Sequence, residues 1–264
     1  MIELSEQRID DLSEEFESCW DFKTAGHVGL LNFLASQELE AQVDRRLAVV
    51  LIQVDIERSW MAWSKHVEKI GNETDAVQLI EQLSQMPSID KYSDLFRSQS
   101  EFTDSLDELA SCEFACRSQW GDSIGSRYYE HHFGISITDS DQSQLRQVRC
   151  EFDPSLRNAN VAFPLNGKNA LGRQRSTDKL SSFVEQLPDG NRIVVADRLD
   201  AEISRNQLDV RLLTHKYAIA TNVSSVNPVL VSDFTKLQPS EGRLLSFPFS
   251  IGLPGRKLFF SYCG

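Results

Sequence analysis

Arginine, serine and asparagine recur in three short segments of the C-terminal half, and together they suit an anionic ligand. The first segment holds Arg173, the second Ser204 and Arg205, and the third Ser225 and Asn227. An arginine carries a permanent charge and presents a planar fork of donors that can bind two oxygens of one anion. Serine and asparagine add neutral donors, but they are also ordinary turn residues. These residues could therefore bind a ligand or simply stabilise turns. The elements that position them decide between these two interpretations.

Other reactive residues lack the spacing that enzymes and metal sites require. Cys112 and Cys116 lie four positions apart, on one face of a helix, and His131 and His132 follow them. A zinc site from these four residues is conceivable, but the spacing is not that of a zinc ribbon, and buried cysteines are common. The sequence contains no G-x-S-x-G, H-E-x-x-H, P-loop, dinucleotide-binding or protein-kinase motif. We therefore expect no catalytic residue, no metal and no cofactor, in a protein that is not an enzyme.

The two halves of the 264-residue chain differ strongly in charge. Residues 145–264 hold 16 basic and 11 acidic residues, a net charge of +5, whereas residues 1–144 hold 11 and 28, a net charge of −17. This asymmetry indicates two units with different partners. The acidic unit would repel nucleic acid, so we expect no nucleic-acid partner. The basic unit suits an anionic ligand.

The sequence predicts a cytoplasmic protein without a membrane partner. It contains no apolar run long enough to span a bilayer. The acidic N-terminus has neither the basic nor the apolar region of a signal peptide. The five cysteines are scattered and odd in number, which indicates reduced thiols rather than a disulfide framework.

Residues 1–120 predict an acidic helical domain. Apolar residues recur at helical spacing between Ile9 and Trp20. The longest candidate helix covers about residues 39–65, where neither glycine nor proline occurs and apolar residues form a stripe that includes Trp60. Capping residues and an acidic first turn favour further helices. These predicted helices cover residues 76–83 and 103–116, with a short one around 92–96.

Residues 121–145 predict a linker, with room for one extra strand at 135–138, and residues 146–264 predict an all-β domain. In the latter, short stretches rich in Val, Ile, Phe and Tyr alternate with turn residues at regular intervals, which is typical of a sandwich or barrel. The predicted fold class is thus α + β multidomain, an N-terminal all-α domain followed by an all-β sandwich. The predicted strands are 148–152, 159–163, 192–195, 208–213, 217–221, 244–249 and 257–262.

Four segments of this β region resemble the forkhead-associated (FHA) domain family in their order and spacing. The resemblance covers residues 146–262. The segments are 163–178 (FPLNGKNALGRQRSTD), 203–207 (ISRNQ), 221–227 (TNVSSVN) and 237–242 (LQPSEG) followed by LLSFPFSIG. They resemble the family's strand–turn–strand with its Gly-Arg signature, its Ser-Arg-x-His element, its Asp-Leu-Gly-Ser-Thr-Asn-Gly turn and its late strands. Gly172 and Arg173 stand in the diagnostic Gly-Arg position.

The resemblance implies a sandwich that binds phosphothreonine peptides. A phosphothreonine presents nearly two negative charges and three acceptor oxygens. Arg173 and Ser204 would bind the phosphate, with Arg205 as a neighbouring donor. Asn227 would hydrogen-bond the peptide main chain, and Ser225 would support the same turn. The resemblance also implies a small pocket for the threonine methyl group, which selects threonine over serine.

Two residues depart from the family pattern. Gln207 stands where the family has a histidine that braces the loop around Ser204, although glutamine also offers donors and an acceptor for this role. Pro228 stands where the family has glycine; because proline lacks an N–H and cannot take positive φ, the turn that aims Asn227 must differ. Asn222 replaces the more usual aspartate. An alternative is therefore a structural interaction protein with a degenerate FHA fold that no longer binds phosphate.

The N-terminal half is similar to the helical leader of planctomycete-type bacterial serine/threonine kinases, although its Phe-Pro ending is missing and no kinase domain follows. With both resemblances, we predict a non-enzymatic phosphothreonine-peptide-binding adaptor in serine/threonine kinase signalling. Its partner would be a phosphothreonine-containing protein, such as a kinase or its substrate. The segments that carry the second resemblance are RIDDLSEEFESCWD (8–21), LLNFLAS (30–36), RRLAVVLIQVDIERSW (45–60) and IDKYSDLF (89–96).

Overall fold

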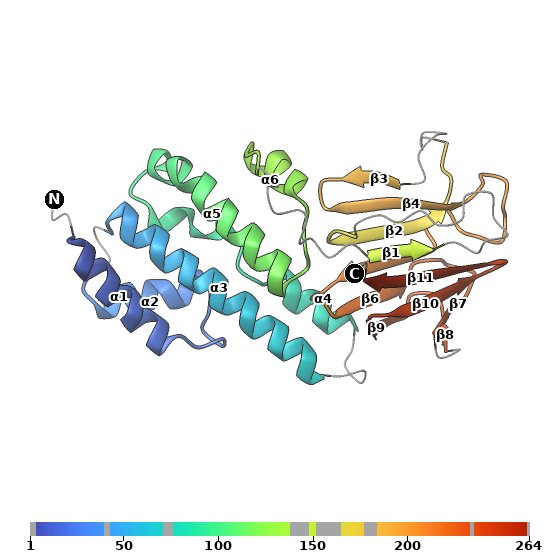
Figure 1. Cartoon of the computed structure of the whole chain (residues 1–264), viewed down its shortest axis with the longest axis horizontal. Helices are drawn as coiled ribbons and strands as arrows, with labels where there is room; N and C mark the ends of the chain where they lie inside the picture. Colours follow the sequence, from blue (N-terminus) through green and yellow to red (C-terminus); the bar gives the residue numbers. More distant parts are fainter. Residues whose placement is uncertain are drawn as a thin grey trace.

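The protein consists of a helical half followed by a half made of strands. The computed structural model describes residues 4–39, 43–70, 76–137, 148–151, 165–176, 184–232 and 235–262. The helices lie against one end of the strands, and the opposite end carries only loops (Figure 1). The predicted fold class, an all-α region followed by an all-β sandwich, is confirmed.

The central helix of the N-terminal half is α3 (Arg45–Ile70), which packs against α1 (Glu6–Cys19) and α5 (Gln99–Trp120). It buries residues on several sides, Trp60 and Trp63 among them, and so it is more deeply enclosed than a one-sided stripe predicts. Within the described residues, no helix is long and apolar enough to cross a membrane. The remaining elements are α2 (His27–Ser36), α4 (Ala76–Ser84), the 3₁₀ helix η2 (Ile89–Leu95) and α6 (Ser126–Phe133).

The start of α5 differs from the prediction of residue 103. The helix begins at Gln99 because Ser98 caps it: the Ser98 hydroxyl accepts the N–H of Glu101 at 3.2 Å. The Glu101 carboxylate in turn accepts the N–H of Arg97 at 3.1 Å. The first of these bonds satisfies one of the amide groups that the first helical turn leaves open, and the second ties the residue before the cap to the helix.

Two antiparallel-rich sheets form the sandwich, in the orders β1-β11-β10-β7-β8 and β3-β4-β2-β5-β6-β9. Only β2 and β4 pair in parallel among the described pairs. The core between the sheets is apolar, with Ile193, Val210, Ile251 and Phe260 fully buried. The strands are β1 (Val148–Glu151), β2 (Lys168–Arg173), β3 (Val184–Leu187), β4 (Gly190–Ala196), β5 (Leu208–Leu212), β6 (Tyr217–Asn222), β7 (Val229–Val231), β8 (Lys236–Leu237), β9 (Gly242–Ser246), β10 (Phe249–Leu253) and β11 (Arg256–Tyr262). The predicted strand at 159–163 lies outside the described residues.

The segment expected as a linker contains helix α6. This helix buries Tyr129 completely and ends at Gly134, whose φ of 71° is the left-handed conformation that glycine adopts readily. No strand forms at the described residues 135–137, and Thr138 lies outside the described part of the chain. The side chain of Ile135 instead joins the helical core, so this segment packs against the helices. The proposed division at 1–120, 121–145 and 146–264 remains a prediction.

The two halves share a hydrophobic core. Leu213, Ile219 and Leu244 of the sandwich belong to the apolar cluster that the helices form. Polar contacts cross the same boundary: the indole N–H of Trp63 donates to the carbonyl of Leu213 at 2.9 Å, and the N–H of Gly167 donates to the carbonyl of Asp122 at 3.1 Å. The helices therefore cover one end and part of an outer face of the six-stranded sheet, and they leave its other end free.

Candidate functional site

Three loops meet at the free end of the six-stranded sheet. They follow β2 (residues 174–176 as described), join β4 to β5 (197–207) and join β6 to β7 (223–228). Because β2 and β4 are parallel and β5 is antiparallel to β2, the ends of β2 and β4 and the start of β5 share one edge. The pairing of β5 with β6 brings the end of β6 to the same edge. The topology thus gathers the three polar segments singled out in the sequence.

Gly172 allows the loop before β5 to lie directly on β2. A Cβ atom at this position would stand 2.2 Å from the carbonyl oxygen of Arg205 and 2.9 Å from that of Ser204. Two backbone hydrogen bonds fix the contact: Arg173 N–H donates to the carbonyl of Ser204 at 3.0 Å, and Gln207 N–H donates to that of Leu171 at 2.8 Å. Arg173 and Ser204 therefore lie at the same end of the sheet.

The Arg173 guanidinium is half-buried and incompletely bonded. Its Nη1 donates to the carbonyl of Arg198 at 2.5 Å. Its Nε is buried and has no hydrogen-bond partner among the described residues. Because this atom is enclosed, an incoming acceptor would approach the guanidinium at its Nη groups rather than at Nε. Arg175, Arg198 and Arg205 belong to the same loops, together with the acidic residues Asp197, Asp200 and Glu202, so the surroundings carry charges of both signs.

Gln207 connects the Ser204 loop to the Asn227 turn from beneath. It is fully buried. Its Oε1 accepts the N–H of Ser204 at 3.0 Å, and its Nε2 donates to Oδ1 of Asn222 at 3.2 Å and to the carbonyl of Asn227 at 3.1 Å. Asn222, also fully buried, donates to the carbonyls of Asn227 and Leu237 at 2.9 Å. The two amides thus hold the backbone of the Ser204 loop and of the Asn227 turn in place.

Ser224, which the sequence reasoning missed, is the serine that contacts Ser204. The two hydroxyl oxygens lie 2.7 Å apart. Ser224 Oγ also accepts the N–H groups of Val226 and Asn227 at 3.2 and 3.1 Å. Ser225 is exposed, and none of the described hydrogen bonds involves its side chain. The signal that could have found Ser224 is its place two residues after Asn222, whose side chain accepts the Ser224 N–H at 3.1 Å in a local turn.

Asn227 is turned toward the neighbouring loop. Its side-chain amide donates to the carbonyl of Glu202 at 2.6 Å, and its own carbonyl accepts from Gln207 and Asn222. Pro228 follows it on the surface, immediately before β7. The structure therefore brings Asn227 to the predicted place, with its side-chain amide bound within the protein.

Arg192 is a second residue that sequence reasoning missed. Only 2% of it is exposed. Its Nη2 donates to the carbonyls of Arg173 and Arg205 at 2.8 and 2.7 Å, and its Nη1 to that of Ala170 at 3.3 Å. Arg205 itself is exposed and contributes its backbone carbonyl to this contact. Arg192 therefore places a positive charge beneath the loops; an arginine within an apolar strand was the available signal.

The cysteine and histidine pairs lie on separate helices. Cys112 and Cys116 belong to α5, where burial and the hydrogen bond with Cys112 raise the pKa of the Cys116 thiol, whereas His131 and His132 belong to α6. Within the part of the chain that the structure describes, no group of three or more His, Cys, Asp or Glu residues could hold a metal ion.

Asp55 connects the segments that resemble the helical leader of planctomycete-type kinases. The indole N–H of Trp20 donates to Oδ1 of Asp55 at 2.7 Å, and the hydroxyl of Tyr92 donates to Oδ2 at 2.6 Å. Arg58 forms an ion pair with Glu17 beside them. These contacts give the motif residues a shared structural role; the likeness to a kinase leader remains a prediction.

Comparisons with known proteins identify distant structural likenesses only. No protein-family model matches the chain, and no curated protein matches it at a significant level. Among solved structures, the FHA domain of the CT664 protein from Chlamydia trachomatis is 15% identical, with a TM-score of 0.33; the match covers 45% of this chain and 99% of that one. An engineered FHA domain with a Myc-pTBD peptide is 12% identical, with a TM-score of 0.32; the match covers 45% of this chain and 92% of that one.

Proposed function

We propose that this protein is a non-enzymatic adaptor that binds phosphothreonine peptides through the loops at the free end of the six-stranded sheet. One observation carries the proposal: Arg173 places a half-buried guanidinium at the free end of the sheet. It lies against the loop of Ser204 in a framework held by Gln207. A phosphate group would supply the charged acceptors that this guanidinium lacks.

Each residue of the site has a distinct part in this function. Arg173 provides the charged donors to the phosphate, and the hydroxyl of Ser204, steadied by Ser224, provides a neutral one. Arg205 stands exposed for a peripheral charge contact. Gly172 and Gln207 act on the backbone, because they fix the loop that carries Ser204. Arg192 adds fixed positive charge from below, which strengthens attraction of an anion.

Phosphorylation of a partner by a serine/threonine kinase would create the ligand. The serine/threonine kinase or its substrate is then the partner, and binding is switched on by the two charges of the new phosphate. Selection of threonine over serine would rest on burial of one methyl group, a difference of about 1 kcal/mol. Ser225 and the side chain of Asn227 would contact the peptide only after a change in the 223–228 turn.

A second candidate is a structural interaction protein whose sandwich no longer binds phosphate. Two observations favour it. The amide of Asn227 is bound to the carbonyl of Glu202, and Nη1 of Arg173 is bound to that of Arg198. In this alternative, the two side chains hold the 197–207 loop closed, and a peptide has no free group to bind.

A titration of the full chain separates the two functions. A phosphothreonine-peptide library is compared with unphosphorylated and phosphoserine versions by fluorescence anisotropy. We expect selective binding that falls at least about 100-fold in Arg173→Ala, since a charge-assisted phosphate contact is lost. Arg211→Ala removes the same charge from β5, near the other end of the sheet, and should leave the affinity unchanged.

The serine pair tests the geometry more finely. Ser224→Ala should weaken binding about fivefold, because it releases Ser204 and the Asn227 turn. Ser225→Ala should leave the affinity unchanged, because no described contact uses that side chain. Equal, weak binding of phosphorylated and unphosphorylated peptides would favour the structural alternative instead.

A further inference from the structure

The corner between α1 and α2 has an apolar helix face that no described residue covers. Helix α2 (HVGLLNFLAS) is apolar on nearly all sides, a composition typical of an enclosed helix. Leu30, Phe33 and Leu34 point into the core, but Val28 is 67% exposed and Leu31 37% exposed. Phe22, in the connection between the two helices, is also 37% exposed. Val28 and Leu31 are three residues apart on one helix face, and exposed apolar neighbours of this kind are typical of a surface that another molecule covers.

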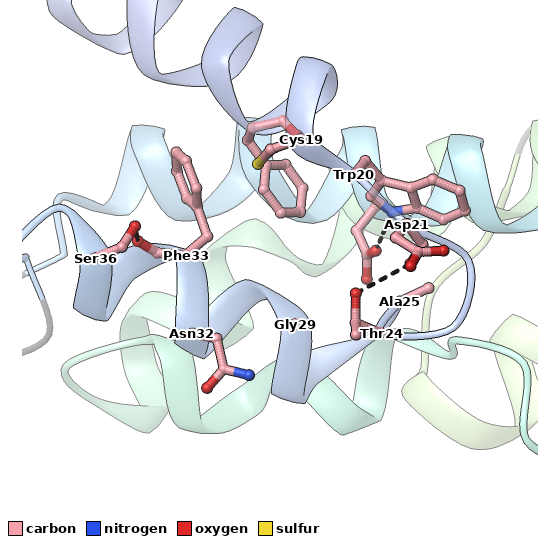
Figure 2. A pocket seen from close by; sticks show the side chains of 11 residues that line it. Cys19, Trp20, Asp21, Thr24, Ala25, Gly29, Asn32, Phe33 and Ser36 are labelled. Atoms are coloured by element: carbon pink, nitrogen blue, oxygen red, sulfur yellow. Dashed lines mark hydrogen bonds between the residues drawn. The ribbon is translucent and has the colours of Figure 1, made fainter.

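A pocket of about 230 Å³ opens between α1 and the flank of α2 that carries Gly29, Asn32 and Ser36. Its walls include the aromatic rings of Phe16, Trp20 and Phe33. Figure 2 shows Trp20 and Thr24 on one side of the pocket and Phe33 with Ser36 on the other. Aromatic faces carry negative charge density and attract cations such as ammonium and guanidinium groups.

A carboxylate without a cation lines the same pocket. Asp55 is 1% exposed and lines the cavity. Its oxygens accept from the indole N–H of Trp20, the N–H of Gly26 at 3.2 Å and the hydroxyl of Tyr92. Burial and the nearby Asp55 charge raise the pKa of Tyr92 well above its usual value, so this hydroxyl keeps its proton and donates. No Lys, Arg or His among the described residues forms an ion pair with Asp55, although buried carboxylates are generally paired with one.

The Asp55 carboxylate has capacity for one more donor. An ionised carboxylate offers about four acceptor positions, and the three neutral donors leave one of them on Oδ2. The surrounding unit adds long-range attraction, because residues 1–144 carry a net charge of −17. The same negative charge would oppose the approach of this face by an identical face of a second copy.

We propose that this corner binds a basic peptide segment of a partner protein, with one lysine or arginine side chain entering the pocket toward Asp55. An apolar side chain of the segment covers Val28, which lies one helical turn before the pocket residue Asn32. Three features select this occupant over others: the aromatic walls, a buried carboxylate that has hydrogen-bond donors but no cation, and the negative charge of the helical half. The site is independent of the loops at the sandwich end, which bind an anion in the proposed function.

Calorimetric titration of the full chain with a synthetic peptide tests this site. The probe is an acetylated and amidated hexapeptide, Leu-Ser-Leu-Arg-Leu-Ser, compared with the same peptide that carries citrulline, the neutral analogue of arginine, at the fourth position. We expect the arginine peptide to bind at least about tenfold more tightly, the size of one charge-assisted contact. Equal affinities of the two peptides overturn the proposal.

Variants locate the binding and control for folding. Asn32→Trp places a large ring at the pocket from an exposed position and should abolish arginine-peptide binding without a change in melting temperature. Asp55→Asn should remove the preference for arginine over citrulline, provided that circular dichroism shows a folded protein. Because this buried variant can fail to fold, Asn32→Trp carries the test alone if it does. Unchanged binding in Asn32→Trp overturns the proposed location.

The apolar face has a matched control. Val28→Ser should weaken binding about threefold, the effect of a partly buried valine. Val77→Ser changes a similarly exposed valine, 58% accessible, on α4, and should leave the affinity unchanged. Sedimentation of the peptide-free chain completes the test: a dimer that becomes a monomer in Val28→Ser would show that a second copy covers this face, contrary to the proposal.

Discussion

The two ends of the six-stranded sheet are built by different means. At the helix-covered end, apolar residues fill the boundary, and the polar groups Trp63 Nε1 and Gly167 N–H are bonded across it. At the free end, polar side chains hold loops to one another, and Arg173 keeps a buried donor without a partner. The difference shows that one sheet can use one end for internal packing and reserve the other for a charged surface.

Removal of the helices should destabilise the covered end of the sheet. We expect it to lower the free energy of unfolding more than any other change. A fragment of residues 146–264 would expose Leu213, Ile219 and Leu244, each worth roughly 2 kcal/mol when buried. We expect its free energy of unfolding to fall by about 6 kcal/mol, so that the fragment is unfolded or only marginally stable. Urea denaturation followed by circular dichroism measures this. An unfolding midpoint equal to that of the full chain would show that the shared core contributes nothing.

Gln207→Ala should destabilise the loops at the free end of the sheet. We expect an intermediate loss of unfolding free energy. The change leaves the N–H of Ser204 without its described acceptor, and it removes one of the two donors to Asn222 Oδ1 and to the carbonyl of Asn227. We expect a loss of roughly 3 kcal/mol in unfolding free energy, because unsatisfied buried groups are costly. Denaturant titration gives the value, and Gln186→Ala on the exposed strand β3 serves as the control with no change. A loss equal to the control would mean that the Ser204 loop and the Asn227 turn hold together without this amide.

Lys216→Met tests an ion pair at the helix-covered end of the sheet. We expect it to have the smallest effect on stability of the three changes. The Lys216 ammonium bonds the Glu68 carboxylate at 2.5 Å across the boundary and lowers the pKa of Glu68 below 4.5. A depressed carboxyl pKa gives stability that is present above pH 4.5 and is lost as the pH falls through the lower folded value. Because both groups are exposed to solvent, we expect a difference of only about 0.5 kcal/mol at pH 7.

Thermal unfolding of wild type and Lys216→Met between pH 3 and pH 7 tests whether this stability is lost as the pH falls. The two melting curves should converge at low pH, and high salt should also bring them together, since salt screens exposed pairs. A difference that grows as the pH falls would contradict the assignment of the effect to Glu68.

Local patterns predicted the architecture because each strand and helix has its own periodicity. Strands β5 and β6 fall within one residue of their predicted ranges, since apolar residues alternate in β5 and turn residues bound both strands. The covering of β6 by helices was not predicted. Its consecutive buried residues Ala218, Ile219 and Ala220 need apolar neighbours on both faces, and a run of this kind is typical of a strand enclosed on both sides. Helix α6 was missed because its eight residues include aromatic and histidine side chains of modest helix propensity.

The candidate site could be located from the sequence, but its contacts could not. The order of the motifs placed Arg173 and Ser204 at one end of the sheet, where backbone contacts now join their loops. The choice between Ser224 and Ser225 depends on which side chain a turn directs inward, and neighbouring residues in a turn point to different sides. Arg192 was missed for another reason: its carbonyl partners come from separate segments and carry no side-chain signature.

The shared core has a mechanical consequence. The α1–α2 corner lies in the helical half and the loop cluster lies at the far end of the strands (Figure 1), with packed elements rather than a slack tether between them. Two proteins seated at these extremes would be held at a constant spacing and in a constant mutual orientation. The chain would then act as a rigid spacer, and any stretching or bending of an assembly built on it would have to occur in the bound proteins.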